Sequence, residues 1–295
     1  MGSLQLPVEL TDRIIDFCHD DKRTLSNCAL THSSWLPASH FHLFHVITLD
    51  AQVDADRANQ LKSFIHEKSL SHRRSSVLSY IRVVKIELLP SSNGVPQLGN
   101  THCITHMIRQ LCDSESLPAP SVHVSLAKLS SGPESCIALS TFPLVGDIVT
   151  HVRLADASFA DGNDIWPFLS SFPRLQCLEL SKIGFDDYSR PALPSERIFD
   201  GVPLSKLRIT TAFMGFIISS LITIADSLNY LEDFGVTYQD IRQARLPQLA
   251  EVIQSRVRRL RFNASCYPGP RRSMEIRPSV FNTRKRTSPS HRSGN

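Results

Sequence analysis

The chain of 295 residues lacks the short motifs that anchor the common catalytic sites. No GxSxG, HExxH, GxxxxGK[ST] or GxGxxG pattern occurs, and the chain has only 12 glycines. Such patterns hold a nucleophile, a zinc ion or a phosphate group in a fixed backbone geometry. Hydrolase, zinc-protease and nucleotide-binding activities are therefore without support, and we expect no cofactor.

Signals for membrane insertion and secretion are also absent. The longest apolar run, FMGFIISSLITIA, is shorter than a bilayer span and contains Ser219 and Ser220. The first residues do not form the basic and apolar leader of a secretory protein. The seven cysteines are an odd set without a CxxC pair, which favours reduced thiols. We expect a cytoplasmic or nuclear protein with no membrane partner.

Basic residues do not outnumber acidic ones outside the C-terminal segment. Residues 271–295 carry seven Lys or Arg against one acidic residue, Glu275, so their net charge is +6. Because the whole chain has a net charge of +4, residues 1–270 carry −2. A nucleic-acid-binding domain needs basic residues clustered on its folded surface. We therefore expect no nucleic-acid partner, and we interpret residues 267–295 as a disordered basic tail.

Two histidine-rich segments, THCITHMIRQLC and SHFHLFH, are the only candidates for a metal site. In the first, His102 and His106 lie one helical turn apart, but Cys103 points away from that line. In the second, the histidines are two or three residues apart and do not converge. Since metal ligands must share a face, we expect no metal in either segment.

Near its start the chain contains signals for three short helices. Pro7 suits a first helical turn, where its missing N–H costs nothing. The residues after it place four apolar side chains on one helix face: Leu10, Ile14, Phe17 and Cys18. Asp20 and Asp21 can cap a second helix, and Pro37 opens a third. Three helices of this length bury little surface, so the unit needs a neighbouring domain or a partner.

Further along, one apolar pattern recurs: apolar, two residues, apolar, one residue, apolar. Copies such as VTHVRL and RLQCLEL end at residues 126, 154, 180, 209, 236 and 262, at intervals of 28, 26, 29, 27 and 26. Helix-like segments such as DIWPFLSSF and LPQLAEVIQSRV separate them. A strand of this form with a period of roughly 20–29 residues is typical of leucine-rich repeats. We therefore predict an α/β solenoid, with an ordinary α/β sheet as the alternative.

The opening segment resembles the F-box as it occurs in fungal F-box proteins. The resemblance rests on LPVELTDRIIDF, LSNCALTHSSWLP and the HLF and ITL that follow, and it covers about residues 4–49. One departure is Thr31 and His32, where many F-boxes carry an apolar pair such as Val-Cys.

The resemblance implies a substrate receptor of a Skp–cullin–F-box ubiquitin ligase. An F-box binds the Skp-type adaptor and through it the cullin, while downstream repeats recruit a protein substrate. Because other subunits transfer ubiquitin, the resemblance also implies that this chain has no catalytic residue. Carried onto this chain, the residues expected at the adaptor are Leu6, Pro7, Glu9, Leu10, Ile14, Ile15, Leu30, Trp35, Leu36 and Pro37.

The predicted organisation has four parts. They are an F-box at 4–50, a connecting helical segment at 51–77, the leucine-rich-repeat-like solenoid at 78–266 and the basic tail at 267–295. Two other functions are retained as alternatives. A repeat scaffold that works without the ligase is favoured if Thr31 and His32 spoil docking. An enzyme would require a polar cluster in a pocket.

Overall fold

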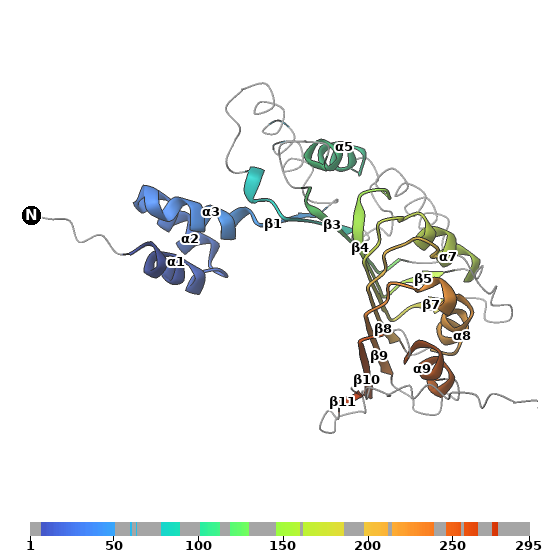
Figure 1. Cartoon of the computed structure of the whole chain (residues 1–295). Coiled ribbons are helices and arrows are strands. Elements are labelled where there is room, and N and C mark those ends of the chain that lie inside the picture. The colour runs from blue at the N-terminus through green and yellow to red at the C-terminus, as the bar shows by residue number, and fades with distance from the viewer. Residues whose placement is uncertain are drawn as a thin grey trace, which may run out of the picture.

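Figure 1 shows the computed structural model of the chain. The structure describes residues 7–50, 60, 63, 78–88, 101–112, 119–129, 146–159, 162–185, 198–211, 214–238, 246–254, 257–264 and 273–276. Nearly all of the predicted connecting segment 51–77, and Leu6, lie outside these residues.

The chain begins with the three predicted helices, α1 (Val8–Phe17), α2 (Lys22–Thr31) and α3 (Leu36–Phe44), with a short 3-10 helix, η1 (Ser33–Trp35), before α3. Pro7 precedes the first turn of α1, and its carbonyl oxygen accepts hydrogen bonds from the amides of Leu10 and Thr11. The Asp21 carboxylate caps α2 by accepting from the amides of Arg23 and Thr24, at 3.0 and 3.1 Å. The predicted starts of all three helices are confirmed.

The rest of the described chain is built on one nine-stranded sheet in the order β1-β2-β3-β4-β6-β8-β9-β10-β11. All neighbouring strands are parallel except β11, which is antiparallel to β10. The strands are β1 (Val46–Asp50), β2 (Val83–Leu88), β3 (Ser121–Ala127), β4 (Val149–Ala155), β6 (Cys177–Ser181), β8 (Lys206–Thr211), β9 (Asp233–Tyr238), β10 (Arg259–Ala264) and β11 (Ser273–Ile276). The predicted α/β class is confirmed.

The recurring apolar pattern specifies how these strands pair. Its middle position is held by Val152, Leu178, Leu207, Phe234 and Leu260, which stand directly opposite one another along the sheet. Each of these side chains is at most 5% exposed. Because side chains alternate between the two faces of a strand, the pattern buries one whole face of the sheet.

Four helices cover that buried face (Figure 1). They are α5 (Thr101–Cys112), α7 (Gly162–Ser170), α8 (Met214–Ile224) and α9 (Leu246–Gln254). Each lies in the sequence between two strands that are neighbours in the sheet, and their apolar residues join the same core. Within the described residues no helix covers the opposite face, which we call the helix-free face.

The turns after three strands repeat the same unusual backbone conformation. Lys128, Asp156 and Lys182 directly follow β3, β4 and β6, and their φ angles are +56°, +51° and +52°. The amide of each donates to the strand next along the sheet, to Ala155, Ser181 and Thr210 at 2.6–2.9 Å. Shortly after the second and third turns come the short strands β5 (Ser158–Phe159) and β7 (Gly184–Phe185), which pair with each other.

The basic tail differs from its prediction at one point. Within residues 267–295, for which the sequence predicts disorder, Ser273–Ile276 forms β11 and pairs with β10. The prediction is therefore wrong for these four residues, and the rest of the segment lies outside the described residues. With only two apolar residues, Met274 and Ile276, this four-residue strand has too weak a pattern to be recognised within a basic segment. In the part of the chain that the structure describes, no helix has the length and apolarity to cross a bilayer.

Candidate functional site

The three N-terminal helices have a small core of their own. Its buried residues are Thr11, Ile15, Leu25, Cys28 and Ser39. Across this core the helices are joined by His42 Nε2 on α3 and Asp16 Oδ1 on α1, which are 2.8 Å apart. So small a core leaves much of each helix facing outward.

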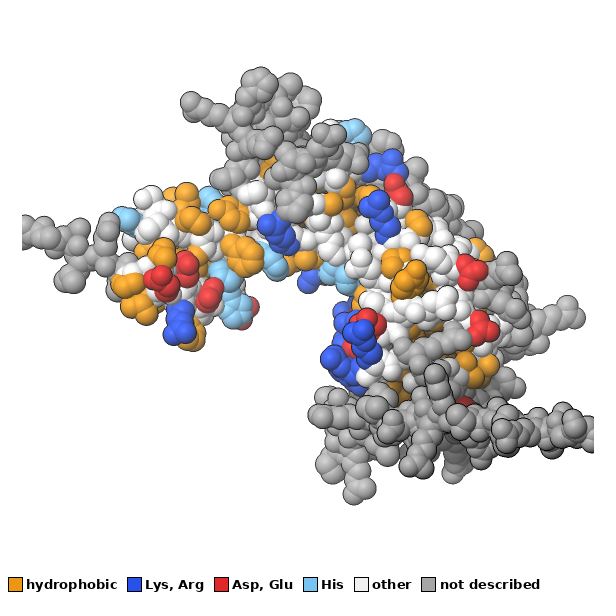
Figure 2. Space-filling model, viewed as in Figure 1, with side chains coloured by type: hydrophobic (Ala, Val, Ile, Leu, Met, Phe, Trp, Pro, Cys, Tyr) orange, Lys and Arg blue, Asp and Glu red, His pale blue; other side chains and the backbone are white. Residues whose placement is uncertain are grey.

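The outward faces of these helices are unusually apolar. Seven of the nine exposed large hydrophobic side chains in the described residues lie here: Val8, Leu10, Ile14, Phe17, Leu30, Leu36 and Phe41. Phe17 is 88% exposed and Leu30 86% exposed. We call these seven residues the N-terminal apolar set, and part of it is visible on the left of Figure 2. Concentrated exposed apolar side chains mark sites at which another molecule binds.

The apolar stripe predicted on α1 exists, but most of it faces outward. Leu10 and Ile14 are 47% and 43% exposed, and Phe17 is the most exposed of the three. The helix packs instead through Thr11 and Ile15. Because α1 has apolar residues on both sides, periodicity alone could not show which side is buried.

The structure places the predicted adaptor residues in three environments. Pro7, Glu9, Leu10, Ile14, Leu30, Leu36 and Pro37 are exposed, and Trp35 is half-buried. Ile15 has no exposed surface, so it belongs to the core and cannot touch a partner while the helices are folded. Sequence reasoning missed Val8, Phe17 and Phe41 as surface residues, although their exposed fractions of 40–88% place them in the apolar set.

The charges on this unit are mainly acidic. Residues 7–44 contain five Asp or Glu, at 9, 12, 16, 20 and 21, against three basic residues, Arg13, Lys22 and Arg23. Hydrogen bonds from the side chain and amide of Thr24 lower the pKa of Asp21. The N-terminal apolar set therefore lies among carboxylates, and a partner with basic residues around an apolar centre would complement it.

Thr31 and His32, which depart from the F-box pattern, make local hydrogen bonds. The Thr31 hydroxyl donates to the Asn27 carbonyl oxygen at 2.8 Å. His32 Nδ1 accepts from the amide of Ser34 at 3.2 Å and so caps η1. Both residues are exposed beside Leu30.

Neither histidine-rich segment gathers metal ligands within the described residues, where no group of three His, Cys, Asp or Glu could hold an ion. His40 packs edge-on against Phe44 and Tyr80, and His42 contacts Asp16. On α5, His106 is exposed, whereas the side chains of His102 and Cys103 lie outside the described part. The buried Cys28 and Cys177 thiols have raised pKa values because burial disfavours the thiolate.

Comparisons with known proteins add no family to these observations. No protein-family model matches the chain, and no curated protein matches it significantly.

Proposed function

We propose that the chain is the substrate receptor of a Skp–cullin–F-box ubiquitin ligase, with residues 4–50 as the F-box that binds the Skp-type adaptor. The observation that carries the proposal is the N-terminal apolar set, which stands on a folded three-helix unit that cannot bury it. Burying one Leu or Phe side chain contributes about 1.5–3 kcal/mol. Phe17 and Leu30, as the most exposed members, are the expected anchors of the interface.

We also propose that the sheet and its helices are a leucine-rich-repeat-like solenoid that recruits the substrate. Three features support this. Strands that are neighbours in the sheet follow one another along the sequence. The apolar pattern is in register from strand to strand. The left-handed turn residues Lys128, Asp156 and Lys182 recur at repeat spacing. In a solenoid the face without helices is open for a protein partner.

The alternative is a repeat scaffold that works without the ligase. The polar Thr31 and His32, both exposed next to Leu30, favour it, because they interrupt the apolar surface where many F-boxes continue it. Both proposals give the sheet a binding role, so only the N-terminal helices distinguish them.

Titration of the purified full chain with a Skp-type adaptor tests the proposal. The double variant Phe17→Ser/Leu30→Ser should bind the adaptor about ten- to a hundredfold more weakly, since tenfold corresponds to about 1.4 kcal/mol. Both side chains are almost fully exposed, so circular dichroism and melting should match the parent. The matched control is Tyr230→Ser/Val252→Ser, which removes the two exposed large apolar residues that the described part of the chain has outside the set.

Two results would contradict the proposal. If the parent binds no adaptor, the chain is not a ligase subunit of this kind and the scaffold alternative replaces it. If parent and Phe17→Ser/Leu30→Ser bind equally well, the N-terminal apolar set is not the adaptor surface.

A further inference from the structure

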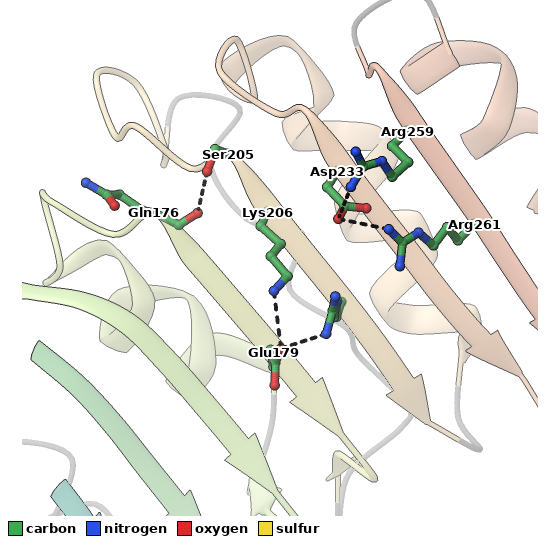
Figure 3. Close-up of polar contacts among 8 residues, drawn as sticks. Gln176, Glu179, Ser205, Lys206, Asp233, Arg259 and Arg261 are labelled. Atoms are coloured by element: carbon green, nitrogen blue, oxygen red, sulfur yellow. Dashed lines mark hydrogen bonds and ion pairs between the residues drawn. The ribbon is translucent and has the colours of Figure 1, made fainter. Parts of the chain in front are cut away.

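The helix-free face is unevenly charged, and its C-terminal half carries a cluster of six charged side chains, four of them basic. Its members stand on β6, β8, β9 and β10, at positions that alternate with the buried ones. They are Glu179, Lys206, Arg208, Asp233, Arg259 and Arg261, and we call them the charged patch. Figure 3 shows them on adjacent strands, and basic side chains gather on this side of the sheet in Figure 2.

Within the charged patch, two carboxylates are shared among four cations. One oxygen of Glu179 lies 4.0 Å from Lys206 Nζ and 3.4 Å from Arg208 Nη1. One oxygen of Asp233 lies 3.9 Å from Arg259 Nη1 and 3.7 Å from Arg261 Nη2. Tight charged hydrogen bonds are about 2.7–2.9 Å long, so these contacts are loose. The patch therefore keeps an excess of two positive charges and guanidinium groups that are not held in close pairs.

Gly235 leaves a gap in the middle of the patch. In the sheet register it stands directly between Arg208 on β8 and Arg261 on β10. Its φ is not in the left-handed region, and an added Cβ would meet its nearest atom, Arg208 Cγ, at 3.7 Å, an ordinary contact. Neither backbone strain nor lack of space therefore requires glycine here. The gap is this absent side chain alone: Arg208 and Arg261 stand on its two sides in the neighbouring strands, and the stem of Arg208 lies within contact distance of it.

We infer that the charged patch binds an acidic segment of a protein, with an Asp or Glu carboxylate entering the gap at Gly235 between Arg208 and Arg261. Charge complementarity carries this choice, because an incoming carboxylate can form the close pairs that Glu179 and Asp233 do not supply. A nucleic acid fits less well. Glu179 and Asp233 would repel a continuous phosphate backbone, and no outward position of β6, β8, β9 or β10 carries an aromatic side chain for base stacking.

This inference rests on the proposed function, since it names the class of substrate that the receptor recruits. Its test needs no adaptor. Fluorescence anisotropy would measure binding of the full chain to a labelled peptide of alternating Asp and Ser, with the Asn-Ser peptide as the uncharged probe. We expect the parent to bind the Asp-Ser peptide more tightly, and more so at low salt. In Arg208→Gln/Arg261→Gln the affinity should fall about tenfold.

Two further variants separate this site from general charge effects. Gly235→Val should fill the gap and weaken binding while the chain stays folded, because β-branched residues suit strands. Arg109→Gln/Arg174→Gln removes the same charge away from the patch and should bind like the parent.

The inference would be overturned if the two double variants weakened binding equally, or if Gly235→Val bound like the parent. It would also be overturned if a single-stranded oligonucleotide of equal charge bound more tightly than the peptide and lost affinity in the same variants. Adaptor titration reports separately on the ligase role. If the chain binds the peptide but not the adaptor, the acidic-segment site stands and the ligase role is rejected. If it binds the adaptor but not the peptide, the ligase role stands and the site is rejected.

Discussion

At the scale of single residues, an uncommon feature is a pair of histidines on the helix-free face. The rings of His123 on β3 and His151 on β4 stack with their centroids 3.9 Å apart. Ser121 Oγ lies 3.0 Å from His123 Nε2 and 3.3 Å from His151 Nδ1. The pKa of His123 is lowered to about 4, mainly by burial and further by the nearby charges of His151 and Lys85. Burial also lowers the pKa of His151, with a smaller effect of Lys206 that Glu179 opposes.

This pair predicts a loss of stability in mild acid. The folded chain keeps His123 neutral, whereas an unfolded chain protonates it below a pKa of about 6.5. The unfolded state therefore binds more protons between pH 6.5 and about 4, and the free energy of unfolding falls as the pH falls through that range. Urea unfolding at several pH values should show that the free energy of unfolding falls less on acidification for His123→Gln than for the parent. His106→Gln, at an exposed position on α5, is the control, and an identical pH dependence in all three proteins would contradict the prediction.

At the scale of elements, the turns that follow the strands repeat more strictly than their sequences do. Two of these positions hold lysine and the third holds aspartate, Asp156, yet all three have positive φ. This conformation costs an L-residue roughly 1–2 kcal/mol. The backbone hydrogen bond that each of these amides donates to the neighbouring strand holds the turn in this conformation. The Lys182 ammonium also lies 3.0 Å from the Asp156 carboxylate, but both are exposed, so the pair contributes little.

Lys182→Gly should therefore stabilise the protein slightly. Glycine removes the cost of positive φ and adds roughly 0.5–1 kcal/mol of backbone entropy to the unfolded chain. We expect a net gain of up to about 1 kcal/mol in urea unfolding. Ser181→Gly, one residue earlier in β6, gains nothing from positive φ and should be destabilising. If both variants lost stability equally, the left-handed turn would not be a source of strain.

The elements also show what a sequence can and cannot predict here. The strands were predictable because the apolar pattern repeats one buried side every 26–29 residues, and the helix starts because Pro7, Asp21 and Pro37 act locally. The outward side of α1 was not predictable, since Leu10 and Ile15 are both strongly apolar and only packing distinguishes them. The left-handed turns escaped notice because no glycine marks them. The recurring pattern places Glu179, Arg208 and Arg261 at equivalent positions, but it does not show which of the charged side chains form ion pairs across the strands.

At the scale of the whole molecule, a sheet that grows by adding parallel strands has two open edges. Unpaired N–H and C=O groups at such an edge invite pairing with a second chain. At one edge is β1, which the chain enters directly from α3. At the other, β10 would be the last parallel strand, and β11 covers it through four residue pairs, from Leu260–Ile276 to Asn263–Ser273. A short strand from a basic segment that is poor in apolar residues is thus the edge strand, and short edge strands with nearby charges are less prone to pair with a second chain.

Two truncations test this role of β11. Removing residues 277–295 leaves β11 in place, so the melting temperature and the degree of self-association should match the parent. Removing residues 271–295 deletes β11 and leaves β10 as a bare edge. Because each net hydrogen bond contributes about 0.5–1.5 kcal/mol, unfolding should become easier by a few kcal/mol. Analytical ultracentrifugation should then show self-association that grows with concentration, as expected for an uncovered strand. Equal melting and equal monomer content in the two truncated chains would mean that β11 neither stabilises nor protects the edge.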